Sequence, residues 1–188
     1  RRTAVLRAEV EGGHPVGQLV VVAIELQRDD QVGVEAVGVV QRTVHPGVAE
    51  DVAAVLLRLK PTDQRTMISR IKALAPAVQN AGAALLVDGH PEIVARGGAD
   101  GAHLTGLAAL EDAAPSLKPD RIAGIGGLAT RHDSMNAGEQ GADYVLFGEP
   151  DANGQRPSSQ AIAERLDWWA ELFEPPCVGF AVSLEEAH

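Results

Sequence analysis

The chain has 188 residues, of which 45% are hydrophobic and 22% charged, and its formal net charge is −10 at pH 7. This length suits a single domain with a sizeable core. The negative charge argues against nucleic acid and anionic membranes as partners, so a small anionic ligand would need locally concentrated positive charge. Cys177 is the only cysteine, which excludes an intramolecular disulfide, and no uninterrupted apolar run approaches about 18 residues. We therefore expect a cytoplasmic protein.

The first 50 residues differ in composition from the rest, with 13 valines but no serine, lysine, asparagine or aromatic residue. Residues 18–25 and 32–40 have strand-like composition, but no clear helix separates them. Residues 1–50 are either the first barrel strand with an atypical arm, or a stretch foreign to the fold, such as a shifted reading frame. Residues 51–188 form the part that is built from repeating units.

From residue 51 onward, apolar runs alternate with amphipathic segments. Continuous apolar runs predict strands buried on both faces, at 51–59, 83–88, 101–104, 122–125, 144–147 and 177–182. Helical spacing predicts a helix that begins after Thr62, its expected cap, and further helices at 91–96, from 130 to about 140, and at 159–173. Thr130 and Asp133 resemble a capping box, and Ser183 begins a last helix.

The triplet Gly-Ala-Asp occurs at 98–100 and again at 141–143, and each copy precedes an apolar run. A third strand lies midway between them, so the repeating unit has about half this spacing, which is the length of one strand and one helix. Repetition of such a unit predicts a parallel sheet that closes into a barrel.

The stretch from Val52 to Pro150 resembles the thiamine-phosphate synthase family, including its thiazole tautomerase relatives. The resemblance rests on the strand end LLRLK and on the pair GADGAHL and GADYVLFGEP at this spacing. It implies an α/β fold, the (β/α)₈ TIM barrel, here atypical at the N-terminus and incomplete at the C-terminus. Such a barrel has two open edges, and a neighbouring copy of the chain in a homo-oligomer, the valine-rich arm or missing residues would have to deal with them.

The resemblance also implies a reaction in thiamine biosynthesis, which joins hydroxymethylpyrimidine diphosphate to a thiazole phosphate. Diphosphate would leave with the help of Mg²⁺. Departure of diphosphate requires cations and hydrogen-bond donors around its oxygens, and carboxylates to hold the metal. In a parallel barrel these groups belong at the carboxyl ends of the strands.

Arg58 and Lys60 stand at the end of the first predicted strand of this part. They match the basic members of a family Gln-x-Arg-x-Lys pattern, whose Gln position is Leu56, and the resemblance implies that they contact the diphosphate. Residues two apart on a strand point to the same side. The alternative is a pair of solvated cations on the rim. Anion binding and catalysis by both are favoured, because few other cations of this acidic chain converge on a strand end.

The metal-binding carboxylates of the family are matched poorly. Asp88-Gly89-His90 replaces the family's Asn-Asp-Arg, so that Asp88 falls on the Asn and Gly89 on the magnesium-binding Asp. Asp88 is either a catalytic group and a weak metal ligand, or part of a turn before the next helix. The second metal carboxylate has no counterpart at residues 105–108.

Other residues could line the site. His103 matches a family His, and we expect a hydrogen-bonded core residue, with a place at the edge of the site as the alternative. Gly126, Gly127 and Thr130 could bind phosphate where a helix begins, although packing or a turn explains the glycines equally well.

The histidine of the tautomerases would fall on Ala129, so the tautomerase interpretation loses its key residue. Glu149 is a carboxylate at the expected mouth of the barrel, which either replaces a lost ligand or repels a diphosphate.

These observations predict a thiamine-phosphate-synthase-like transferase that binds small phosphorylated metabolites. The alternative is a catalytically silent barrel that binds such a metabolite as a sensor or accessory protein. A third possibility is an unrelated small-molecule enzyme on the same scaffold.

Overall fold

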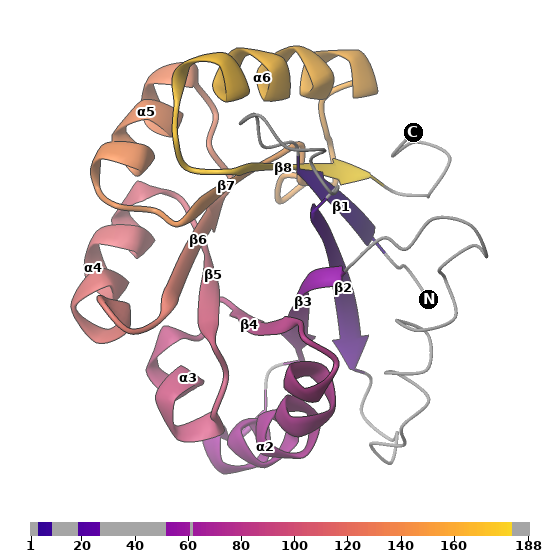
Figure 1. Ribbon diagram of the computed structural model, residues 1–188, viewed down its shortest axis with the longest axis vertical. Helices are drawn as coiled ribbons and strands as arrows, with labels where there is room; N and C mark the ends of the chain where they lie inside the picture. Colours follow the sequence, from indigo (N-terminus) through magenta and orange to yellow (C-terminus); the bar gives the residue numbers. More distant parts are fainter. Residues whose placement is uncertain (1–3, 9–18, 27–51, 61, 182–188) are drawn as a thin grey trace.

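The computed structural model describes residues 4–8, 19–26, 52–60 and 62–181. In these residues eight strands pair in chain order into a closed ring (Figure 1). The strands are β1 (Ala4–Ala8), β2 (Leu19–Leu26), β3 (Val52–Leu59), β4 (Ala84–Asp88), β5 (Gly101–Thr105), β6 (Ile122–Gly126), β7 (Tyr144–Phe147) and β8 (Cys177–Ala181). Five helices of the described part lie outside the strands: α2 (Gln64–Asn80), α3 (Pro91–Gly97), α4 (Leu107–Leu117), α5 (Arg131–Glu139) and α6 (Ser159–Leu172).

The ring departs from the expected (β/α)₈ barrel on its N-terminal side. Each successive pair of strands from β2 to β8 is parallel. Strand β1 is antiparallel to both of its neighbours, β2 and β8. Among the described residues, strand–helix alternation runs from β3 to β8, an α/β half-barrel of six parallel strands that β2 and β1 close into a ring. In this chain β1, from the valine-rich segment, pairs with both free edges. The strand predicted at 32–40 and the helix predicted from Ser183 lie outside the described residues.

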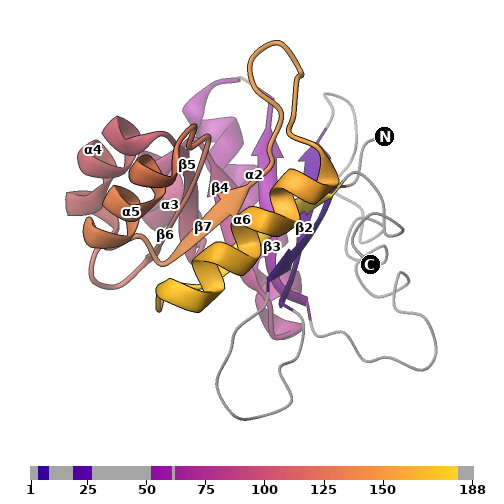
Figure 2. The same ribbon diagram turned by 90° about the horizontal axis from the view of Figure 1, so that it is seen from above.

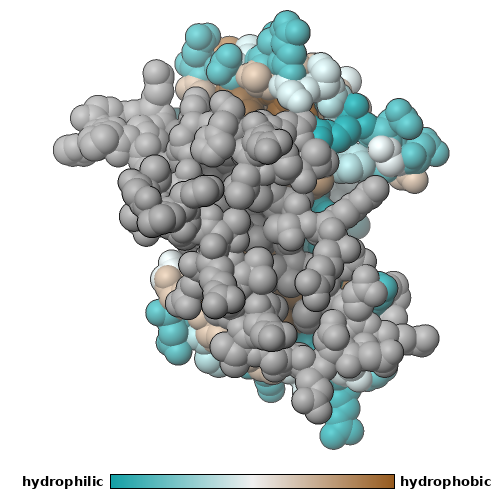
Figure 3. Space-filling view, turned by 90° about the vertical axis from the view of Figure 1, so that its right-hand side faces the viewer, coloured by the Kyte–Doolittle hydropathy of each residue, from teal (hydrophilic) through white to brown (hydrophobic). Residues whose placement is uncertain are grey.

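The strands separate two apolar layers, because alternate side chains point to opposite faces of a strand. Ala54 and Leu56 of β3 pack inside the ring with residues of β4, β7 and β8. Val55 and Leu57 point outward and pack beneath the helices. Both faces are buried, which explains why the strands read as continuous apolar runs. Figure 3 shows hydrophilic residues beside hydrophobic ones at the top and bottom edges of one face.

The predicted elements agree with the structure to within a residue or two at most ends, but one predicted cap is wrong. Asp63, not Thr62, caps α2, because its Oδ1 accepts a hydrogen bond from the backbone N–H of Thr66 at 2.9 Å. The capping box of Thr130 and Asp133 is confirmed at the start of α5. None of the described helices is long and apolar enough to cross a membrane.

The two Gly-Ala-Asp triplets have the same structural role. Each glycine has a positive φ, 78° at residue 98 and 86° at residue 141, which reverses the chain after a helix. The aspartate at residue 100 then accepts a hydrogen bond from the backbone N–H of Leu85 at 2.7 Å, and the aspartate at residue 143 accepts one from Ala123 at 2.6 Å. Each triplet thus ties two neighbouring strands together at their amino ends, opposite the face where a barrel site is expected.

Candidate functional site

A cavity of about 740 Å³ opens at the carboxyl ends of the parallel strands. Its lining comes from β3, β4, β5 and β7, from the loops that follow β6 and β7, and from α6. Figure 2 shows the loop between β7 and α6 rising above the ring of strands. The polar side chains at the cavity include those of Arg58, Asp88, Thr105, Glu149, Arg156 and Arg165.

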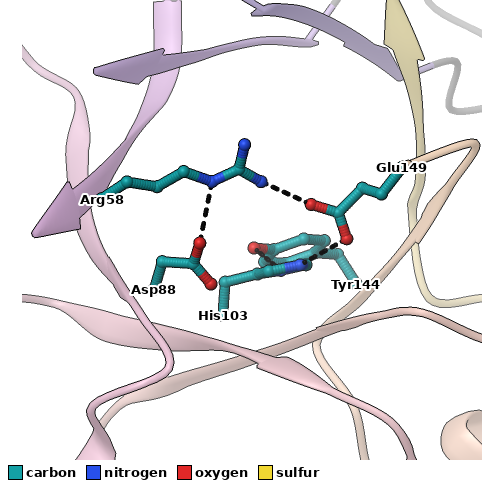
Figure 4. Close-up of polar contacts among 5 residues, drawn as sticks. All are labelled: Arg58, Asp88, His103, Tyr144 and Glu149. Carbon is teal, nitrogen blue, oxygen red and sulfur yellow. Dashed lines mark hydrogen bonds and ion pairs between the residues drawn. The ribbon is translucent and has the colours of Figure 1, made fainter. Parts of the chain in front are cut away.

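Arg58 lies between two carboxylates that come from distant parts of the chain (Figure 4). Its Nε donates to Oδ2 of Asp88 at 2.8 Å, and its Nη2 donates to Oε1 of Glu149 at 2.6 Å. Arg58 follows Leu56 on the inward face of β3, so its side chain enters the ring just above the apolar layer. Its third nitrogen points away from both carboxylates (Figure 4). Two negative charges thus surround one positive charge.

His103 joins this cluster from β5, and its side chain is 1% exposed. Its Nδ1 lies 2.8 Å from the hydroxyl of Tyr144, and its Nε2 lies 3.1 Å from Oε2 of Glu149. The imidazole and the Tyr144 ring are stacked, with centroids 5.7 Å apart.

The hydrogen bonds indicate where the protons lie in the buried series Tyr144, His103 and Glu149. Burial, followed by the charges of Glu149 and Asp88, raises the pKa of Tyr144 above its ordinary value, so its hydroxyl remains protonated. That proton needs an acceptor, and Nδ1 of His103 is the ring nitrogen within reach. The other ring nitrogen, Nε2, then donates to Oε2 of Glu149.

Glu149 titrates below its ordinary range although it is largely buried. Burial alone would raise its pKa, but the hydrogen bond from His103, and then the charge and hydrogen bond of Arg58, outweigh burial and lower the pKa. Glu149 is therefore a carboxylate at neutral pH.

Gly126 and Gly127 are explained by the space available at the end of β6. A Cβ at Gly126 would overlap Oε2 of Glu149 and lie 2.9 Å from Nε2 of His103. Gly127 has a φ of 67°, and a Cβ there would lie 2.6 Å from Cγ2 of Thr105. Gly126 thus leaves room for the Glu149–His103 pair, while Gly127 lines the cavity.

Four residues proposed from the sequence are not among the residues that line this cavity: His103 and Gly126, which lie against Glu149, and Lys60 and Thr130. Lys60 follows the end of β3, is half-buried, and is not among the lining residues that the structure describes. Thr130 is exposed and its hydroxyl exchanges hydrogen bonds with Asp133 in the capping box. Their predicted roles in phosphate binding remain predictions.

The chain matches known proteins of one family. Residues 27–182 match the family model described as thiamine monophosphate synthase. The chain belongs to this family. A thiamine-phosphate synthase from Rhodospirillum centenum is 37% identical over 142 residues, which cover 74% of this chain and 69% of the relative. One from Hyphomonas neptunium is 35% identical over 136 residues, covering 69% and 62%.

The fold also resembles a solved structure. Thiamine phosphate pyrophosphorylase from Pyrococcus furiosus superposes with a TM-score of 0.52 at 22% identity, over 60% of this chain and 55% of that chain. At this identity the likeness concerns the fold alone. The chain spans 62% of the length of the relatives from Hyphomonas neptunium and Erythrobacter litoralis.

The described residues of this thiamine-phosphate synthase family member do not fit a magnesium site. The described residues include no group of three or more side chains of the kinds that could hold a metal ion. Asp88 and Glu149 do converge, but Arg58 lies between them and neutralises part of their charge. Mg²⁺ takes six oxygen ligands, of which proteins commonly supply one or two carboxylates. Here both carboxylates are paired with a guanidinium, which makes them a poor donor set.

Sequence reasoning missed two residues of the cluster and cavity. Tyr144 was expected only as the start of a strand, although a buried tyrosine hydroxyl requires a partner and thus signals a polar neighbour inside the ring. Arg165 of α6 donates to the carbonyls of Leu128 at 3.2 Å and Ala129 at 2.8 Å. Nothing in the helical pattern separates Arg165 from an ordinary solvated arginine. Within the part of the chain that the structure describes, these partners are neutral carbonyls and no carboxylate pairs with Arg165.

Proposed function

We propose that this chain catalyses the thiamine-phosphate synthase reaction, joining hydroxymethylpyrimidine diphosphate to a thiazole phosphate. The bond between the pyrimidine methylene carbon and the diphosphate breaks, its electron pair leaves with the diphosphate, and the thiazole bonds to the methylene carbon. The observation that carries the proposal is the cavity at the carboxyl ends of the strands, with Arg58 and Arg165 among its lining residues, in a chain of this family.

In this proposal, Arg58 and Arg165 supply the positive charge for the phosphate groups. Arg58 has one nitrogen that points away from its carboxylate partners and can donate to a diphosphate oxygen (Figure 4). Arg165 contributes a charge that carbonyl groups hold in place without neutralising it. Fixed donors of this kind stabilise the negative charge that develops on a departing diphosphate. No step is assigned to magnesium, because the described residues do not fit it.

Formation of thiamine phosphate from the two substrates, with and without Mg²⁺, tests the proposal. We expect turnover by the unmodified protein and a loss of at least about 100-fold in Arg58→Ala, the scale seen when a donor to a developing anion is removed. Arg65→Ala is the matched control, because Arg65 is exposed on α2 and does not line the cavity. Equal turnover in Arg58→Ala and Arg65→Ala would overturn the assigned role of Arg58.

A second candidate function is supported by the two carboxylates around Arg58 and by the poor fit to magnesium. It is a silent barrel that binds a phosphorylated pyrimidine or thiazole. Absence of turnover in the unmodified protein, together with a rise of the melting temperature on adding diphosphate or thiazole phosphate, would favour this candidate over the synthase.

A further inference from the structure

Glu149 is held in one place by groups on three sides. Arg58 and His103 each donate to a different oxygen of its carboxylate, at 2.6 Å and 3.1 Å, and Gly126 lies against it without a side chain. The side chain is only 12% exposed. A carboxylate with both oxygens occupied and its pKa lowered is a fixed negative charge, not a mobile surface group.

This fixed negative charge contacts Arg58, the cation to which the proposed function assigns diphosphate binding. Asp88 and Glu149 bring two negative charges to Arg58, so the three side chains together carry a net charge of about −1 at neutral pH. A phosphate oxygen that approaches Arg58 therefore meets a guanidinium whose charge is already offset and which already donates from two of its three nitrogens.

We propose that Glu149 is a specificity-determining residue that acts as an internal anion, competing with phosphate-bearing ligands for Arg58. A ligand binds strongly at this end of the cavity only if its own contacts compensate for displacing or approaching the Glu149 carboxylate. Asp88 holds the opposite side of the guanidinium and keeps Arg58 within the ring when Glu149 is displaced. The inference rests on the proposed function, because it takes Arg58 as a ligand-binding cation.

Calorimetric titration with inorganic diphosphate, without magnesium, measures the competition directly. Glu149→Gln keeps the shape of the side chain and removes its charge. We expect it to lower the dissociation constant for diphosphate by about tenfold, equivalent to roughly 1.4 kcal/mol. Glu111→Gln is the control for overall charge, because Glu111 is exposed on α4 and outside the cavity.

Two further variants keep the test decisive. Glu149→Ala removes the same charge, and its result decides if Glu149→Gln does not fold. Arg58→Met, combined with either change at residue 149, asks whether the gain passes through Arg58, and we expect the gain to disappear in that background. The proposal is overturned if folded variants at residue 149 bind diphosphate no more tightly than the unmodified protein, if Glu111→Gln produces an equal gain, or if the gain survives Arg58→Met.

These outcomes are separable from those of the synthase assay. Tighter diphosphate binding by Glu149→Gln in a protein that forms no thiamine phosphate would support the competition and contradict the proposed function. Turnover in the unmodified protein without any gain in Glu149→Gln would do the reverse.

Discussion

Arg58 and Glu149 are 91 positions apart in the chain, yet Nη2 of Arg58 and Oε1 of Glu149 lie 2.6 Å apart inside the ring. The contact spans the ring from β3 to the segment that follows β7, and it places a carboxylate where the family resemblance leads one to expect a phosphate oxygen. Whether the cavity binds anions strongly or weakly therefore depends on how readily this one pair separates.

Gly126 leaves room for the Glu149–His103 pair, so a side chain at residue 126 should displace Glu149. We expect Gly126→Ala to destabilise the protein by about 1–3 kcal/mol, the usual cost of overpacking a filled site. Urea unfolding measures this change. If the overlap with Glu149 is the cause, the double variant Gly126→Ala with Glu149→Ala should recover part of the loss. A double variant whose effects simply add would contradict this explanation.

Tyr144→Phe removes the hydroxyl that donates to Nδ1 of His103 and leaves that buried nitrogen without its partner. We expect a loss of about 1–3 kcal/mol in the free energy of unfolding, because a buried polar atom loses its hydrogen bond. A change at another aromatic residue of β7, Phe147, would not serve as a control, because Phe147 packs in the outer layer. The control is Tyr144→Phe in a His103→Leu background, where the hydroxyl has no such acceptor and the loss of stability should be smaller. An undiminished loss would show that Tyr144 acts independently of His103.

Glu149 should contribute a pH-dependent part of the stability. Its folded pKa lies below the ordinary value of 4.5, so its contribution is present in full above pH 4.5 and is lost as the pH falls through the lower folded value. We expect the stability advantage of the unmodified protein over Glu149→Gln to be constant near neutrality and to shrink below pH 4.5. Arg58, Asp88, His103 and Tyr144 are the titratable groups that face it. Melting temperatures of both proteins across this range measure the difference. A difference that grows on acidification would contradict the assigned direction of the shift.

Magnesium alone should bind the free protein weakly, because the two carboxylates that converge in the cavity are already bound to Arg58. Calorimetric titration with MgCl₂ should show no saturating heat of binding at millimolar concentrations of free Mg²⁺. Arg58→Met should bind Mg²⁺ more tightly, because both carboxylates are released from the guanidinium. Tight binding of Mg²⁺ to the unmodified protein would contradict the view that Arg58 neutralises this pair.

The local patterns of the sequence determined most of the elements from β3 to β8. Continuous apolar runs predicted buried strands, and the Gly-Ala-Asp triplets predicted a strand–helix repeat. These predictions succeed because burial of a strand on both faces, the glycine that ends a helix and the spacing of one unit are set by residues close together in the chain. Helix α4 had no predicted bounds, since its residues carry no cap that the local sequence reveals.

Tertiary structure alone decided which polar groups meet. Arg58, Asp88, Gly127 and Glu149 were each named from the sequence, and all line one cavity, but their mutual contacts were not foreseen. Tyr144 and the antiparallel course of β1 were not predicted either. The physical reason is that strand order and the closure of the ring bring together residues that are far apart in the chain. A sequence pattern can place a charge at a strand end, but only the folded ring determines which charge lies opposite it.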